Sequence, residues 1–108
     1  MADNTENTLP RVEALRQAAA LISGSRDTDY GGPYDNFGRI AEFWSTAFGR
    51  KFTRRDVATA LILVKLSRDA GEGSPYKPDT WIDIAGYAGC GYEVGLKENT
   101  AELAGHPR

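Results

Sequence analysis

Apolar side chains recur every three or four residues along most of the chain, which is the period of an α-helix. Turn-forming residues separate four segments that show this period: 9–23, 34–48, 53–69 and 78–94. No segment alternates apolar and polar residues for long enough to favour a β-strand. The pattern predicts an all-α fold, in which a single domain over residues 1–108 forms a compact four-helix, bundle-like arrangement.

The first predicted helix, residues 9–23, is rich in alanine, which favours helix formation. Its apolar positions share one face: Val12, Leu15, Ala19 and Ile22. Thr8 is the expected N-cap, because a threonine oxygen can accept a hydrogen bond from the first turn. Pro10 is tolerated in that turn, and Gly24 supplies a stop.

The second predicted helix, residues 34–48, follows a loop over residues 23–33 that is rich in Gly, Ser, Asp and Pro. Its apolar residues form one stripe: Phe37, Ile40, Ala41, Trp44 and Phe48. Gly49 follows directly and predicts the end of the helix.

The third predicted helix, residues 53–69, begins with a capping pattern. Thr53 is followed three residues later by Asp56, in the spacing of a capping box with Asp in place of Glu or Gln. Phe52 and Val57 flank the pair in the positions of a hydrophobic staple. Because the helix is apolar nearly all round, we expect it at the centre of the bundle.

The fourth predicted helix, residues 78–94, carries its apolar stripe at Trp81, Ile84, Ala85 and Ala88. Three glycines interrupt it: Gly86, Gly89 and Gly91. Each costs about 1 kcal/mol relative to alanine, so close helix contact or oligomer packing must compensate. Residues 1–7 and the polar tail 96–108 are expected to be flexible, although a short last helix is possible in the tail.

Composition and charge limit the classes of function. The 108 residues are 41% hydrophobic and 26% charged, as in a globular domain. Thirteen basic and fifteen acidic residues give a net charge of −2, which weighs against duplex nucleic acid as a partner. No apolar run approaches the roughly 20 residues of a membrane span, and the N-terminus lacks the basic start of a signal peptide. With a single cysteine, this predicts a cytoplasmic protein.

A first polar cluster lies in the loop before the second predicted helix. Arg26 can clamp a phosphate or carboxylate, and Tyr30 can stack on a base. The glycines that follow let backbone amides approach a ligand. The alternative is an ordinary turn held by Asp and Asn side chains, with Tyr30 packed at the edge of the bundle, and composition favours it.

A second cluster lies late in the third helix, where Lys65 and Arg68 share one face. A cation in an apolar helix must snorkel, pair with a carboxylate or hold a ligand. The sequence is compatible with two roles for Lys65. It can form an ion pair with Asp79 or Asp83, or it can bind a ligand.

A third cluster pairs Asp79 with Asp83 at i and i+4, with Tyr87 one turn further. Two carboxylates at this spacing can hold a divalent metal such as Mg²⁺ if the protein is metal-dependent. Capping is the favoured role for Asp79. Asp83, between two isoleucines, is the best candidate to pair with a cation or bind a metal.

Other chemistries lack their residues. His106 is the one histidine and lies in the tail, so triads based on Ser or Cys have no positioned base. Cys90 and His106 alone cannot form a four-ligand zinc site within one chain.

Four stretches together carry a resemblance: residues 26–31, 36–44, 56–68 and 79–88. They resemble a family of small bacteriophage and prophage proteins, mostly uncharacterised, with a Tyr-Gly loop. Its most specific motif is Asp-x-Trp-x-Asp-x-x-Gly-Tyr, here Asp79 to Tyr87. More distantly, the layout is similar to the MazG-like all-α nucleotide pyrophosphohydrolases. That likeness implies about four acidic side chains around Mg²⁺, but the Glu-Glu-x-x-Glu element of those enzymes is absent here.

The leading hypothesis is a phage protein that binds a phosphorylated nucleotide-type small molecule, as a homo-oligomer, and so sequesters a nucleotide immune signal in the host cytoplasm. Arg26, Lys65 and Arg68 would contact phosphate, and Tyr30 or Trp81 would stack on a base. One alternative is a Mg²⁺-dependent pyrophosphohydrolase, with Glu42 or Asp56 completing a site at Asp79 and Asp83. The other is a protein-interaction module without a small ligand.

Overall fold

The computed structural model describes residues 9–24 and 31–103, with side chains described up to residue 100. It contains four α-helices: α2 (Pro10–Ile22), α4 (Pro33–Phe48), α5 (Arg54–Ala70) and α6 (Pro78–Leu103). The described ranges hold no strand. The all-α prediction with four helices is therefore confirmed.

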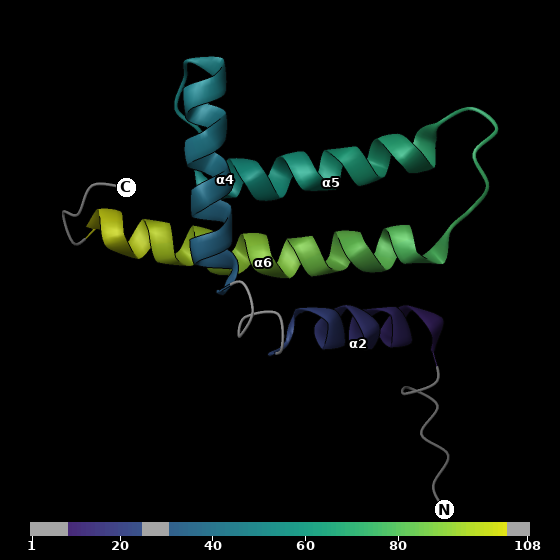
Figure 1. Cartoon of the computed structure of the whole chain (residues 1–108). Coiled ribbons are helices and arrows are strands. Elements are labelled where there is room, and N and C mark those ends of the chain that lie inside the picture. Colours follow the sequence, from purple (N-terminus) through teal and green to yellow (C-terminus); the bar gives the residue numbers. More distant parts are fainter. Residues whose placement is uncertain (1–8, 25–30, 104–108) are drawn as a thin grey trace, which may run out of the picture.

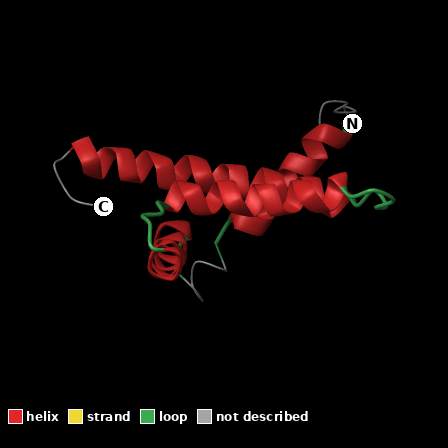
Figure 2. Ribbon diagram, turned by 90° about the horizontal axis from the view of Figure 1, so that it is seen from above, coloured by secondary structure: helices red, strands yellow, loops and turns green. Residues whose placement is uncertain are grey.

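The long helix α6 organises the fold, because it contacts each of the other three helices. In Figure 1, α5 lies antiparallel to α6 on one side, and α2 lies on the other side. Figure 2, seen from above, shows α4 nearly end-on at one face of the antiparallel α5–α6 pair, and α2 crossing this pair obliquely. We refer to α5, α6 and α2 together as the α5–α6–α2 layer. We call the opposite side of the layer, away from α4, the open face.

The predicted end of α4 and the predicted start of α5 agree closely with the structure. Gly49 caps α4 in the left-handed conformation, with φ of 67°, and its N–H donates to the Ser45 carbonyl. Thr53 and Asp56 form the predicted capping box at the start of α5. Phe52 packs against the core from the position before the cap. Local sequence signals therefore determine these boundaries.

The core lies where α4, α5 and α6 meet. Its buried members come from all three helices: Phe37, Ala41, Val57, Ala58, Cys90 and Val94. Within the predicted α4 stripe, Phe37 and Ala41 are buried as expected, whereas Phe48 is exposed. The Phe48 ring instead lies edge-on to Phe52, with centroids 6.0 Å apart.

The prediction that residues 53–69 occupy the centre is wrong. Leu63, Val64 and Leu66 of α5 are exposed, because α5 lies at the edge of the layer and only α4 and α6 cover it. The central helix is α6, whose glycines allow the close packing. A Cβ on Gly91 would lie 3.2 Å from the Cβ of Ala58.

The α2 helix differs from its prediction at its start and in its buried face. Its N-cap position is Leu9, without a side-chain cap, whereas Thr8 lies outside the described residues. Ala18 is its buried residue. Leu15, from the predicted stripe, is 62% exposed, whereas Ile22 of the same stripe packs over Gly86 and Gly89 of α6.

The α6 helix is longer than predicted and turns a different face inward. It continues past Gly95 to Leu103, so the predicted end near residue 94 is wrong. Besides Thr80 near its start, its buried positions recur every four residues: Ile82, Gly86, Cys90, Val94 and Glu98. Trp81 and Ala88, from the predicted stripe, are exposed. The flexible tail expected over residues 96–108 begins inside this helix, and residues 1–7 and 104–108 lie outside the described part.

None of the helices in the described part combines the length and the apolar character that crossing a bilayer requires.

Candidate functional site

An ion pair joins α5 to α6 at the predicted polar cluster. The Nζ of Lys65 lies 2.9 Å from Oδ2 of Asp83. Neither side chain is sealed from water, with exposures of 21% and 32%. The ion-pair interpretation of Lys65 is therefore correct, and the pair remains accessible to a ligand.

Two hollows meet at this ion pair. The polar hollow, of about 610 Å³, lies at the turn between α5 and α6. Its charged wall is formed by Lys65, Arg68, Asp69, Lys77, Asp79 and Asp83. Ser67, Ser74 and Thr80 add hydroxyl groups. Three cations and three carboxylates therefore face one concavity.

The apolar hollow, of about 590 Å³, lies between α2, α4, α5 and α6. Apolar side chains form most of its wall: Leu21, Ile22, Phe37, Ile40, Leu61 and Tyr87. Asn36 and Asp83 supply its polar side chains. Asp83 thus borders both hollows, and a ligand with an apolar and an anionic part can reach across it.

The structure brings most of the predicted site residues together. Lys65, Arg68, Asp79 and Asp83 share the polar hollow, and Tyr87 lines the apolar one. Trp81 lines neither hollow and is exposed. The predictions for Arg26 and Tyr30 lie outside the described residues.

The capping prediction for Asp79 is wrong. The helix begins at Pro78, so Asp79 lies within its first turn, and the Thr80 N–H donates to the Lys77 carbonyl. A carboxylate there is stabilised by the positive end of the helix dipole. This leaves the Asp79 carboxylate on the wall of the polar hollow rather than in a cap.

A metal centre would need more carboxylates beside Asp79 and Asp83. Asp56 is held at the far end of α5, where it accepts from the Thr53 N–H, and Glu42 lines a different cavity. Across the described residues, no group of three or more His, Cys, Asp or Glu side chains is placed to hold a metal ion. The carboxylate set of the pyrophosphohydrolase alternative is therefore not assembled there.

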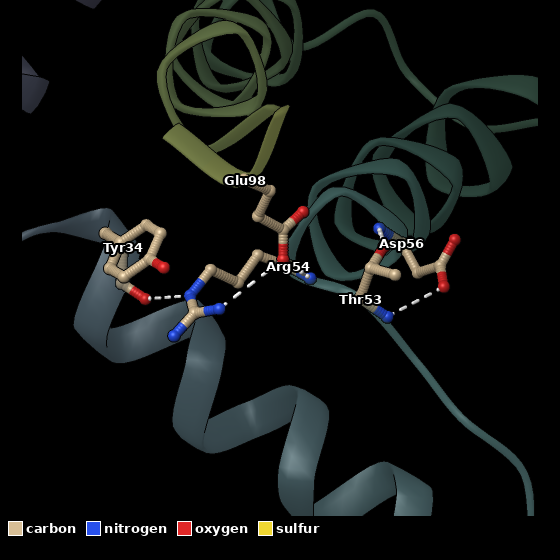
Figure 3. Close-up of polar contacts among 5 residues, drawn as sticks. All are labelled: Tyr34, Thr53, Arg54, Asp56 and Glu98. Atoms are coloured by element: carbon tan, nitrogen blue, oxygen red, sulfur yellow. Dashed lines mark hydrogen bonds and ion pairs between the residues drawn. The ribbon is translucent and has the colours of Figure 1, made fainter. Parts of the chain in front are cut away.

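A further polar cluster, formed by Tyr34, Arg54 and Glu98 and not predicted from the sequence, joins α4, α5 and α6 (Figure 3). Oε2 of Glu98 accepts from the Arg54 backbone N–H at 3.0 Å and pairs with its guanidinium at 3.5 Å. Arg54 Nε donates to the Tyr34 carbonyl at 2.6 Å, and its guanidinium stacks 3.7 Å from the Tyr34 ring centroid. Glu98 is 5% exposed.

This cluster has a structural role. Glu98 satisfies a backbone N–H at the start of α5, where an anion would otherwise bind. The adjoining cavity, of about 650 Å³, is also lined by Arg50 and Lys51. Arg54 and Glu98 are 44 residues apart. No local spacing could have paired them.

Comparison with known proteins gives the family. Residues 13–95 match the model of a family described as Domain of unknown function (DUF6378). The chain belongs to this family. The match covers both hollows and the Arg54–Tyr34 contact, but ends before Glu98.

Curated relatives of this DUF6378 protein come from bacteriophages. It is 42% identical over 76 residues to the Gene 55 protein of Mycobacterium phage D29, covering 70% of this chain and 49% of the relative. It is 42% identical over 86 residues to the Gene 55 protein of Mycobacterium phage L5, covering 79% and 54%. The chain spans about half the length of these relatives. No solved structure matches it.

Proposed function

We propose that this DUF6378 protein binds a phosphorylated nucleotide-type small molecule across the two hollows. One observation carries the proposal: Asp83, paired with Lys65, borders both an apolar hollow and a polar hollow whose wall holds three cations and three carboxylates. A nucleotide has the same division, with a flat base at one end and phosphate at the other.

The apolar hollow is suited to the base. Tyr87, which is only partly buried, offers aromatic surface, and base–aromatic stacking contributes about 1–3 kcal/mol per base. Asn36 and Asp83 offer hydrogen-bonding groups for the base edge or the sugar. A mainly apolar wall with few polar groups is typical of small-molecule sites.

The polar hollow is suited to the phosphate. Lys65, Arg68 and Lys77 supply three cations at its wall. Lys65 is held by Asp83, so a phosphate must compete with that carboxylate for the ammonium group. Arg68 can contact phosphate oxygens through two parallel hydrogen bonds.

Isothermal titration calorimetry with ATP, ADP, AMP, cyclic nucleotides and adenosine tests the proposal. Lys65→Ala and Arg68→Ala should each weaken binding of the phosphorylated compounds about 10- to 100-fold, the effect of losing a charge-assisted hydrogen bond. Neither should change binding of adenosine. Arg55→Ala is the matched control, because Arg55 is on the same helix and lines neither hollow.

Asp83→Asn separates the two small-molecule hypotheses. If Asp83 competes with phosphate for Lys65, removing its charge should tighten nucleotide binding without metal. If Asp83 holds Mg²⁺ in a pyrophosphohydrolase, the same change should abolish Mg²⁺-dependent release of pyrophosphate from nucleoside triphosphates. Heat from none of the compounds, in wild type and variants alike, contradicts the proposal and favours the protein-interaction alternative.

The biological role that we propose follows from the phage relatives. A protein that binds a nucleotide without consuming it can sequester a nucleotide immune signal in the host cytoplasm. Addition of the protein to a solution of such a signal should then lower its free concentration and leave the molecule intact, as chromatography of the recovered nucleotide would reveal.

A further inference from the structure

Three helices carry exposed large apolar side chains, Leu15 on α2, Leu63 on α5, and Trp81 and Tyr92 on α6, which helical geometry places on the open face. On α6, Gly86 and Cys90 line the apolar hollow on the α4 side. Ala88 lies two residues from each, about 200° around the helix, and so on the opposite side. Trp81 and Tyr92, seven residues before and four after Ala88, continue the same stripe.

The neighbouring helices follow the same rule. Leu61 of α5 and Leu21 of α2 line the apolar hollow. Leu63 and Ala19 each lie two residues away, about 200° around their helices, and both are exposed. Leu15, one turn before Ala19, is exposed as well. Leu15 and Ala19 of the α2 stripe, and Trp81 and Ala88 of the α6 stripe, therefore belong to the open face, whereas Ile22 of the α2 stripe lines the apolar hollow.

We propose that the open face is the interface between two copies of this chain, with α6 packed antiparallel against α6 of the second copy. The stripe along α6 reads large, small, small, large: Trp81, Ala85, Ala88, Tyr92. Its spacings of four, three and four residues are the same in both directions. A two-fold interface requires this symmetry, because the same residues must face each other in reverse order.

The symmetry gives specific contacts. With the two-fold axis between Ala85 and Ala88, Trp81 of one copy faces Tyr92 of the other, and the alanines of the two copies face each other at the centre. Small residues at the centre let the helices approach closely, and aromatic pairs at both ends bury large apolar area.

The area of the open face approaches what a dimer interface needs, and the small core of one chain is consistent with burial against a second copy. From Trp81 to Leu96, α6 runs about 22 Å, and three helices spaced about 9 Å apart give a projected area on the order of 600 Å². A standard interface takes about 800 Å² of accessible surface from each partner. Within the described residues, Val57 and Val94 are the largest side chains that are fully buried, so the chain has little core of its own. A net charge of −2 opposes self-association weakly.

Size-exclusion chromatography with light scattering tests the interface on the whole chain. The wild type should have twice the 11.8 kDa mass of one chain. Ala88→Glu places a carboxylate beside the axis and should give the single-chain mass. Ala88 is exposed within one chain, so the helices should still form, as circular dichroism will verify. Ala47→Glu is the matched control, because Ala47 is an exposed alanine on α4.

Tyr92→Ser keeps the test decisive should Ala88→Glu fail to fold. Tyr92 is 74% exposed in one chain, and its loss should raise the dimer dissociation constant about tenfold or more. A wild type of single-chain mass up to roughly 100 µM, well above the range of standard interfaces, overturns the proposal, whether or not another polypeptide binds the face. A dimer that Ala47→Glu disrupts and Ala88→Glu does not would overturn it too.

Discussion

Glu98 is a buried carboxylate whose surroundings explain its position. It accepts the Arg54 N–H, pairs with the Arg54 guanidinium and so links the far half of α6 to the first turn of α5. Desolvating a carboxylate is costly unless hydrogen bonds replace the lost water. Here the backbone N–H and the guanidinium of Arg54 supply those hydrogen bonds to Glu98. The Lys65–Asp83 pair is shorter, yet it is more exposed and contributes less to stability.

Two alanine substitutions should separate these ion pairs. Glu98→Ala leaves the Arg54 guanidinium and N–H without their acceptor and should lower the free energy of unfolding by about 3 kcal/mol. Lys65→Ala should lower it by less than about 1 kcal/mol, because water screens its partner. Urea unfolding followed by circular dichroism measures both. Equal losses would show that burial does not distinguish the pairs.

Gly38 tests how firmly Arg54 is held. A Cβ at Gly38 would lie 2.6 Å from a terminal nitrogen of Arg54, so the guanidinium must move. Gly38→Ala should therefore destabilise the wild type, although alanine favours a helix by about 1 kcal/mol over glycine. In an Arg54→Ala background the obstacle is gone, and the same change should stabilise the protein. A double-mutant cycle by urea unfolding compares the two effects. The same sign in both backgrounds would contradict the contact.

At the scale of the elements, local signals predicted what local interactions decide. The capping box at Thr53 and the glycine at residue 49 fix the ends of α5 and α4, and both were found. The sequence predicted an end to α6 near residue 94, but helix packing outweighs the cost of Gly95, and α6 continues to Leu103. Apolar periodicity could not predict which face of α2 or α6 is buried within the chain. The same period also occurs on a face that is buried between two chains.

The candidate site was predictable to a similar degree. Lys65 and Asp83 stood out as charges in apolar surroundings, and they meet. The apolar hollow could not be predicted from the sequence. Its wall joins residues of α2, α4, α5 and α6, and their apolar character is what core residues would also show. Lys77 was missed since it lies in a loop, where a lysine is ordinary. Side chains that meet only through the tertiary fold leave no mark in local spacing.

Alanine substitution at two glycines of α6 should change the free energy of unfolding differently. A Cβ at Gly95 would lie 3.5 Å from the Arg55 Cδ, an ordinary contact with a flexible chain. Gly95→Ala should raise the free energy of unfolding by about 0.5–1 kcal/mol. A Cβ at Gly91 would lie 3.2 Å from the Cβ of Ala58, which moves only with its helix. Gly91→Ala should give no gain or a loss. Thermal unfolding of both variants compares them, and a clear gain at Gly91 would show that α5 and α6 are not closely packed.

At the scale of the whole molecule, the two faces of the α5–α6–α2 layer have different roles. On the α4 side, the helices form the apolar hollow, which shares Asp83 with the polar hollow at the turn between α5 and α6. On the open face, they expose Trp81, Tyr92 and Leu15. Ligand binding and self-association are therefore assigned to opposite faces. A substitution on one face should leave the other property intact, and Ala88→Glu should bind nucleotide as the wild type does in calorimetry.

Self-association also predicts how stability depends on concentration. When unfolding separates two copies, mass action favours the folded dimer as the protein becomes more concentrated. Each tenfold increase in concentration should raise the apparent free energy of unfolding by about 1.4 kcal/mol per dimer. The urea midpoint of the wild type should therefore rise across a dilution series, whereas that of Ala88→Glu should stay constant. A wild-type midpoint independent of concentration would mean that the open face adds nothing to folding, and that α2, α4, α5 and α6 of one chain suffice.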